Sequence, residues 1–205
     1  MALTPERVFA QTEPVLQSIY LQFRLGIDTV AGDVPVLLLA ASIAHLLAIR
    51  KEVKIEKLWP FFMIGLGLGG VLGASALIPA VFPALVASIL VGSLAAISIQ
   101  MNFIKIAISV TLVTIVMANA SLSGYSWQHI HSATYLGFFC GMILATMIVY
   151  IPIRVSLVAF HYSWVSIAWR ATSSWLVAIA ILLIALRFAH PPSEMQNWFE
   201  RWANP

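Results

Sequence analysis

Six apolar stretches, each close to the length that a helix needs to cross a lipid bilayer, occupy most of this chain. They cover 34–49, 59–78, 84–99, 103–120, 133–151 and 173–189. A transmembrane helix requires about 20 mainly apolar residues, and 61% of the 205 residues are hydrophobic while only 9% are charged. This balance excludes a soluble globular domain. We therefore expect an all-α integral membrane protein in which residues 34–189 form a bundle of six transmembrane helices.

The segment 153–170 is the ambiguous part of this assignment. It is apolar enough to contact lipid, but Arg154, His161 and Arg170 interrupt it. Proline removes one hydrogen bond of a helix and kinks it without always ending it. We therefore expect the fifth helix to continue beyond Pro152 and an interfacial connection to follow. A seventh span is the alternative.

The positions of lysine and arginine predict the orientation of the spans. Seven of the eleven basic residues flank the same side of the bundle: Arg50, Lys51, Lys54, Lys57, Lys105, Arg154 and Arg170. The loops at 79–83 and 120–131 contain no lysine or arginine. Since cytoplasmic loops are enriched in basic residues, we expect a multi-pass protein of a bacterial-type inner (cytoplasmic) membrane. Six spans then leave both termini on the outer, periplasmic side.

Residues 1–33 are predicted to form an amphipathic segment at the outer membrane surface. Apolar side chains recur there at helical spacing opposite polar ones, as in a helix that lies along the interface. The apolar positions are Val15, Leu16, Ile19, Tyr20 and Phe23. Gly26, Asp28, Gly32 and Asp33 follow, and they predict a turn that leads into the first span.

Residues 190–205 are predicted to form a second interfacial helix. Pro191 and Pro192 end the sixth span, and aromatic residues then share one face of a short helix. Tryptophan prefers the headgroup region, because its ring is apolar and its N–H needs a hydrogen-bond partner. The expected interface anchors of the whole chain are Trp59, Trp164, Trp198 and Trp202.

Small residues at four-residue spacing predict close packing of helices. The motifs consist of Gly65, Gly69 and Gly73 in the second span and of Gly137 and Gly141 in the fifth. Such residues allow the backbones of two membrane helices to approach each other. We expect them to pack helices within the bundle, and dimerisation or close approach of a cofactor are the alternatives.

Few side chains in the sequence could bind a metal ion. His129 and His131 lie on the outer side between the fourth and fifth spans. Asp28 and Asp33 of the N-terminal turn are expected on the same side. Imidazole and carboxylate groups bind transition metals, so these four residues form the candidate metal site, with a solvated histidine pair as the alternative. His45, inside the first span, is expected to bond to a neighbouring helix.

The remaining polar residues exclude several classes of function. No aspartate or glutamate lies within a predicted span, which argues against a proton pump. Ser75 invites comparison with intramembrane serine proteases, but its base must lie within hydrogen-bond reach, and His161 is predicted on the opposite side. The single cysteine, Cys140, excludes a disulfide framework. We expect no enzyme activity and no cofactor, and we expect bound lipids.

The order of these features resembles the HupE/UreJ family, six-helix membrane proteins linked to hydrogenase and urease maturation and proposed as nickel or cobalt permeases. Residues 23–26, with the sequence FRLG, followed by Gly32 and Asp33, look like the start of the family's first helix. The glycine-rich second span and the stretches 82–99 and 133–146 are similar to the corresponding family helices.

The family's histidines are the part that this sequence lacks. At the first helix the family carries histidines where this chain has Thr29 and Val34. At the end of the fourth helix, a histidine-rich H-G-x-A-H-G-like element is replaced by Asn119, Ser121 and Ser123. Amide and hydroxyl groups are weak ligands for nickel or cobalt. The resemblance therefore implies the family's scaffold without its transport site.

Together these observations favour a non-catalytic membrane protein that serves as an accessory or structural subunit of a larger membrane complex. Its expected partners are the lipid bilayer and other membrane-protein subunits, and the net charge of +3 gives no pattern for nucleic-acid binding. The alternative is a permease for nickel, cobalt or another small solute. In that case His45, His129, His131 and the outer aspartates would bind the substrate.

Overall fold

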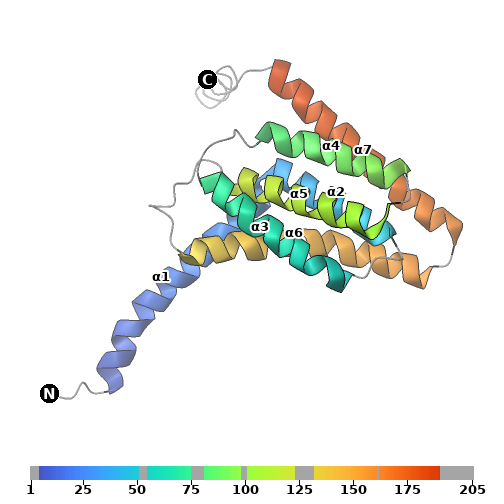
Figure 1. The fold of residues 1–205 in the computed structure, drawn as a ribbon. Helices are drawn as coiled ribbons and strands as arrows, with labels where there is room; N and C mark the ends of the chain where they lie inside the picture. Colours follow the sequence, from blue (N-terminus) through green and yellow to red (C-terminus); the bar gives the residue numbers. More distant parts are fainter. Residues whose placement is uncertain are drawn as a thin grey trace, which may run out of the picture.

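The computed structural model describes residues 5–50, 55–74, 81–97, 101–122, 132–160 and 162–189. This part of the chain forms seven helices and no strand (Figure 1). The helices are α1 (Pro5–Gly32), α2 (Val34–Ile49), α3 (Ile55–Ala74), α4 (Val81–Ile97), α5 (Phe103–Leu122), α6 (Ser132–Ala159) and α7 (Ser163–Ala189). The prediction of an all-α protein is confirmed for these residues.

Three helices are each long and apolar enough to cross a membrane, namely α5, α6 and, from Trp164 onward, α7. The segments Ser18–Gly32 of α1 and Val34–Ile49 of α2 meet the same criteria only as a pair, which bends by 77° at their junction. Counted as one broken span, this pair makes up to four spans. Over Phe82–Ile97, α4 is a shorter apolar helix. The chain is therefore a helical, membrane-associated protein. The number of six spans stays a prediction from the sequence.

The last two helices meet at a tighter connection than the sequence predicts. As expected, α6 continues through Pro152, and it ends at Ala159. The interfacial connection expected up to residue 170 is wrong, because α7 already begins at Ser163. Ser173 Oγ donates to the Trp169 carbonyl at 3.2 Å, and Thr172 Oγ1 lies 2.8 Å from the same oxygen. Polar side chains that bond to their own helix in this way do not interrupt it.

The N-terminal helix is also longer than predicted. We expected a turn at Gly26 and Asp28, but α1 remains helical to Gly32. An ion pair between Arg24 Nε and Asp28 Oδ2, 3.4 Å apart and one helical turn along, supports this helix. Gly26 faces the backbone of α6, where any larger side chain would collide with it. The chain turns only at Asp33, whose Oδ1 accepts a hydrogen bond from Val36 N at 3.4 Å and caps α2.

The central helix of the bundle is α2. It packs against α4, α6 and α7, while α3 packs on α5 and α1 on α6 (Figure 1). Its side chains from Val36 to Ala48 are almost all buried. Leu39, Ile43 and Leu46 join the main apolar core. A helix that is apolar all round is expected to be surrounded by other helices or by lipid, which explains its central place.

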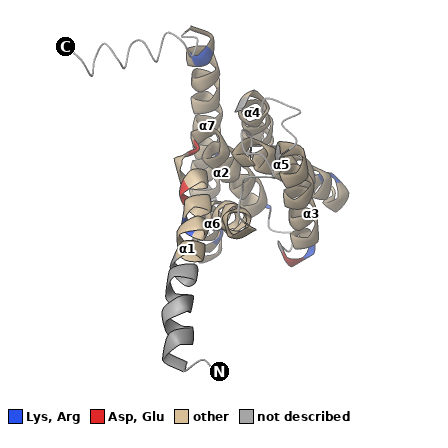
Figure 2. Ribbon diagram, turned by 90° about the vertical axis from the view of Figure 1, so that its left-hand side faces the viewer, with Lys and Arg blue, Asp and Glu red and all other residues tan. Residues whose placement is uncertain are grey.

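The outer surface of the bundle is apolar as well. Large exposed hydrophobic side chains include Leu68, Leu112, Leu144, Ile148 and Val155. Charged residues are few along the described helices (Figure 2). In water such a surface would cause aggregation, whereas towards acyl chains it costs nothing. This surface is what a membrane-associated bundle requires.

Contacts between helices define their relative directions. Gly65 of α3 lies against Thr111 of α5, and Gly73 lies against Asn119, so α3 and α5 run parallel. Phe82 and Phe188 form a ring contact at 6.2 Å near the start of α4 and the end of α7, so these two helices are antiparallel. His45, near the end of α2, bonds to Thr172 in the first half of α7, and Leu38 near its start packs with Ala180. Thus α2 is also antiparallel to α7.

Candidate functional site

Of the four predicted metal ligands, only Asp28 and Asp33 lie in the described part of the chain. Asp28 is exposed and paired with Arg24, and Asp33 is half-buried and engaged as the cap of α2. His129 and His131 lie outside the described residues. Within the described ranges, no group of three or more histidine, cysteine, aspartate or glutamate side chains could hold a metal ion. The two aspartates therefore have structural partners of their own.

The residues that replace the family's fourth-helix histidines lie at the end of α5. Asn119 and Ser121 are buried, with 6% and 3% of their surface exposed, while Ser123 falls outside the described residues. Ser121 Oγ donates to Met117 O at 3.1 Å. Among the described residues, Asn119 Oδ1 has no hydrogen-bond partner. This end of α5 faces Gly73 of α3, whose missing side chain makes room for the Asn119 backbone.

The predicted glycine motifs lie at two different helix contacts. Gly65, Gly69 and Gly73 all face α5, whereas Gly137 and Gly141 of α6 face α1. At each of these positions an added Cβ would come within 3.2 Å or less of a neighbouring helix. This is the close approach that small residues allow in membranes. In both contacts the nearest partner belongs to the same chain.

His45 is the centre of a polar contact between α2 and α7. Its side chain is buried, and Nδ1 lies 2.9 Å from Ala41 O, a group that can only accept a hydrogen bond. Nδ1 therefore carries a proton, and in the neutral ring Nε2 is an acceptor. Thr172 Oγ1 lies 2.9 Å from Nε2 and 2.8 Å from Trp169 O, and its single hydrogen can be donated to either atom but not to both at once. The expectation that His45 bonds to a neighbouring helix is confirmed, and the partner is α7.

The same cluster extends to α6. The indole of Trp169 stands edge-on to the His45 ring, with centroids 5.8 Å apart, and Trp169 Nε1 donates to Ser156 Oγ at 2.7 Å. Arg154 Nη1 lies 3.5 Å from Ala48 O. These bonds join α2, α6 and α7 at the end of the bundle that carries the basic residues. We call His45, Thr172, Trp169 and Ser156 the polar latch.

Breaking the bond between His45 and Thr172 should weaken the contact between α2 and α7. We expect His45→Ala and Thr172→Val each to lower the free energy of unfolding. The coupling energy between the two should be about 0.6–1.7 kcal/mol, the range of hydrogen bonds between membrane helices. Reversible unfolding of both single variants and the double variant in mixed micelles measures it. Strictly additive effects would show that the two groups do not interact. Ser109→Ala, which removes a bond within α5 alone, is the control.

One exposed stripe of α7 carries mainly small residues, although large side chains such as Trp175 and Leu182 are exposed beside it. Six exposed residues follow one another along α7 at intervals of four and three positions in turn. They are Ile167, Ala171, Ser174, Ala178, Ile181 and Ala185. Four of these six side chains are small. The corresponding surface of α6 carries Leu144, Ile148 and Val155 instead. We call this set of six residues the α7 seam, and Trp164 lies at its start with 62% of its surface exposed.

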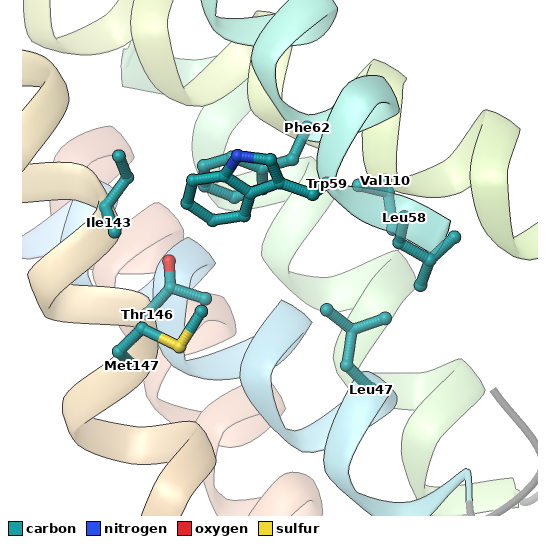
Figure 3. A pocket seen from close by; sticks show the side chains of 8 residues that line it. All are labelled: Leu47, Leu58, Trp59, Phe62, Val110, Ile143, Thr146 and Met147. Atoms are coloured by element: carbon teal, nitrogen blue, oxygen red, sulfur yellow. The ribbon is translucent and has the colours of Figure 1, made fainter. Parts of the chain in front are cut away.

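An apolar recess opens between α3 and α6 (Figure 3). It is a shallow groove with a cavity volume of about 20 Å³, and it is lined by Leu47, Leu58, Trp59, Phe62, Val110, Ile143, Thr146 and Met147. This is about the space of one water molecule, so the recess is an open groove on the surface of the bundle and not a closed ligand pocket. The indole of Trp59 lies across it and is stacked on Phe62, with ring centroids 5.8 Å apart. Trp59, predicted as an interface anchor, thus forms one wall of this recess.

The sequence analysis missed three parts of this arrangement: Thr172 as the partner of His45, the α7 seam, and the recess. The small residues of α7 follow a spacing that is visible in the sequence, but the side that they face is not. Trp198 and Trp202, the other predicted anchors, lie outside the described residues. So does the whole predicted C-terminal helix.

No family model, curated protein or solved structure matches this chain. The fold and the site together define an all-helical, membrane-associated protein with an internal polar latch and an apolar recess. The relationship to the HupE/UreJ family stays a prediction from the sequence.

Proposed function

We propose that this chain is a non-catalytic, six-span subunit of an inner-membrane protein complex, and that α7 is the helix through which it binds its partner. The observation that carries the proposal is the α7 seam. Small residues occupy positions there at which a lipid-facing helix usually carries large side chains. Ala171, Ser174, Ala178 and Ala185 are all exposed.

Small residues favour association of membrane helices for a physical reason. Lipid tails are as apolar as leucine, so helices associate in the bilayer through close van der Waals packing and not through the hydrophobic effect. The spacing of the seam, by four and three residues, is that of a left-handed pair of helices. Only 11% of the apolar window of α7 is buried within this chain. This face is therefore accessible to a helix of another subunit.

Helix directions and charge support the six-span topology. The parallel pair α3 and α5, and the antiparallel relation of α7 to both α2 and α4, agree with helices that alternate across a membrane. Arg50, Lys57, Lys105, Arg154 and Arg170 all belong to helix ends at one side of such a bundle. That side is the cytoplasm by the positive-inside rule. The resemblance to the HupE/UreJ family favours the same number of spans.

A larger side chain in the seam should release the partner. We expect Ala178→Leu to lower the amount of partner recovered with the full-length chain, purified from native membranes in mild detergent, by about tenfold, equivalent to about 1.4 kcal/mol. The physical reason is that overpacking a close interface forces the helices apart. Quantitative mass spectrometry of the purified sample measures the ratio of partner to chain.

Gly67→Leu is the matched control for this experiment. Gly67 is exposed on α3, and an added Cβ meets no described atom within 4 Å, so this variant adds the same bulk to a lipid-facing surface. Its partner recovery should equal that of the unaltered chain. The proposal fails if the unaltered chain purifies as a monomer or as copies of itself alone. It also fails if both variants lose the partner equally.

A further inference from the structure

The recess between α3 and α6 is closed towards the ends of α3 and α5. Phe139 of α6 and Leu122 of α5 both lie against Gly70 there, with the Phe139 Cζ 3.5 Å from the position of an added Cβ. The lining residues that come from α3 lie in its first two turns, and Leu47 lies near the end of α2. The recess therefore occupies the half of the bundle that carries the basic loops.

The lining of the recess is suited to a hydrocarbon chain. Its side chains are apolar except for Thr146, whose hydroxyl is already donated to Met142 O at 2.9 Å. Trp59 is 39% exposed, so the wall that it forms borders the surface of the bundle. A polar or charged ligand would find no partner inside and would lose its hydration. A hydrocarbon chain would supply the van der Waals contacts that the lining side chains lack on their open side.

Basic residues lie beyond the lining residues on three of the helices that form the recess. Arg154 lies on the same face of α6 as Met147, two helical turns or about 10 Å further along, and its Nη1 reaches Ala48 O, next to Leu47. Arg50 caps the end of α2, and Lys57 precedes the lining residue Leu58. Arginine keeps its positive charge at any physiological pH.

The basic residues at this rim outnumber the acidic ones. Glu56, next to Lys57 in the first turn of α3, is the acidic residue of the rim in the described part of the chain. Arg50, Lys57 and Arg154 outnumber this one carboxylate among the described residues. The rim therefore attracts an anion, while the interior accepts only hydrocarbon. These two properties define one kind of ligand.

We propose that this recess binds an anionic phospholipid, with one acyl chain between α3 and α6 and the phosphate group at Arg154, Arg50 and Lys57. Basic pockets between membrane helices on the cytoplasmic side are a usual setting for anionic headgroups. The lipid comes from the leaflet at the Arg50–Lys57 end, which the proposed topology makes the cytoplasmic one. The α7 seam is formed by another helix, so this site does not depend on the proposed partner.

Lipid retention tests this proposal on the full chain. The protein is reconstituted in vesicles of equal parts phosphatidylglycerol and phosphatidylcholine with identical acyl chains, then extracted in mild detergent and examined by native mass spectrometry. We expect one phosphatidylglycerol to be retained in preference to phosphatidylcholine. Arg154→Gln should reduce that preference about fivefold, the contribution of one basic residue at a membrane surface, and Arg154→Lys should restore it.

A second pair of variants separates the acyl-chain site from the rest of the surface. Ile143→Phe fills the recess and should abolish retention, with Met147→Phe as a second filling variant. Leu144→Phe adds the same ring at a neighbouring position that is 49% exposed and should change nothing. Melting curves verify that each variant is folded. Equal retention of both lipids, unchanged retention in both filling variants, or an equal loss in Leu144→Phe would overturn the proposal.

Discussion

Gly69→Ala should lower the free energy of unfolding by about 2–3 kcal/mol, the upper part of the range for overpacking a well-packed site. A Cβ at this position would collide with Ile115 O and would lie 2.7 Å from Ile115 Cα and 2.9 Å from Ala118 Cβ. Two of these three atoms belong to the backbone of α5 and cannot rotate away. The two helices would therefore have to separate along their whole contact. Reversible unfolding in mixed micelles, followed by circular dichroism, measures the effect.

The matched control differs by two positions on the same helix. Gly67→Ala places its methyl group where no described atom lies within 4 Å. It should be neutral or stabilising by up to about 1 kcal/mol, because alanine favours a helix over glycine. The two variants have the same composition and the same helix propensity. Equal destabilisation by both would show that the contact between α3 and α5 is not as close as described.

These glycines show how far the sequence could predict the packing. The four-residue spacing indicates that Gly65, Gly69, Gly137 and Gly141 permit close approach of another helix. It predicts no difference between the motif of α3 and the motif of α6. The structure distinguishes them, since the first motif faces α5 and the second faces α1. A pattern within one helix carries no information about the partner, because the partner depends on how the other helices are arranged.

The ends of the helices were harder to predict for a related reason. Glycine and aspartate favour turns when the backbone is exposed to water, so Gly26 and Asp28 predicted a turn. In the structure, Gly26 serves close approach to α6 and Asp28 pairs with Arg24 within one helix. The start of α7 follows the same logic, because Arg170 and its neighbours suggested an interface. Whether such a residue ends a helix or lies within one depends on the contacts that the folded chain provides around it.

The candidate site depends on contacts between distant parts of the chain. The sequence predicts that His45 needs a hydrogen-bond partner, but Thr172 lies 127 positions further along. The recess is formed by four helices, and each contributes one to three ordinary apolar residues. No local pattern marks such a set. The α7 seam has a regular spacing, yet small apolar residues suit the interior and an interface equally well.

Gly137→Ala should detach α1 from α6 while leaving the rest of the bundle folded. An added Cβ would collide with Phe23 O and would lie 3.1 Å from Gly26 Cα. We expect hydrogen exchange of the backbone amides in Ser18–Gly32 to become about tenfold faster or more, equivalent to about 1.4 kcal/mol of lost interaction. Hydrogen–deuterium exchange with mass spectrometry resolves this segment from the other helices.

The effect should stay local because α1 packs almost entirely on one neighbour. Its contact with α6 is extensive, its contact with α2 is slight, and its break at Asp33 lets it move without displacing α2. Exchange in α3 and α5 should therefore remain unchanged in Gly137→Ala, and Gly32→Ala, whose Cβ meets no described atom within 4 Å, should leave α1 as protected as before. Faster exchange throughout the bundle would contradict this view, since it would make α1 a part of the cooperative core. Faster exchange confined to α1 would identify it as a separately detachable helix, held against the first turns of α6 at Gly137 and Gly141.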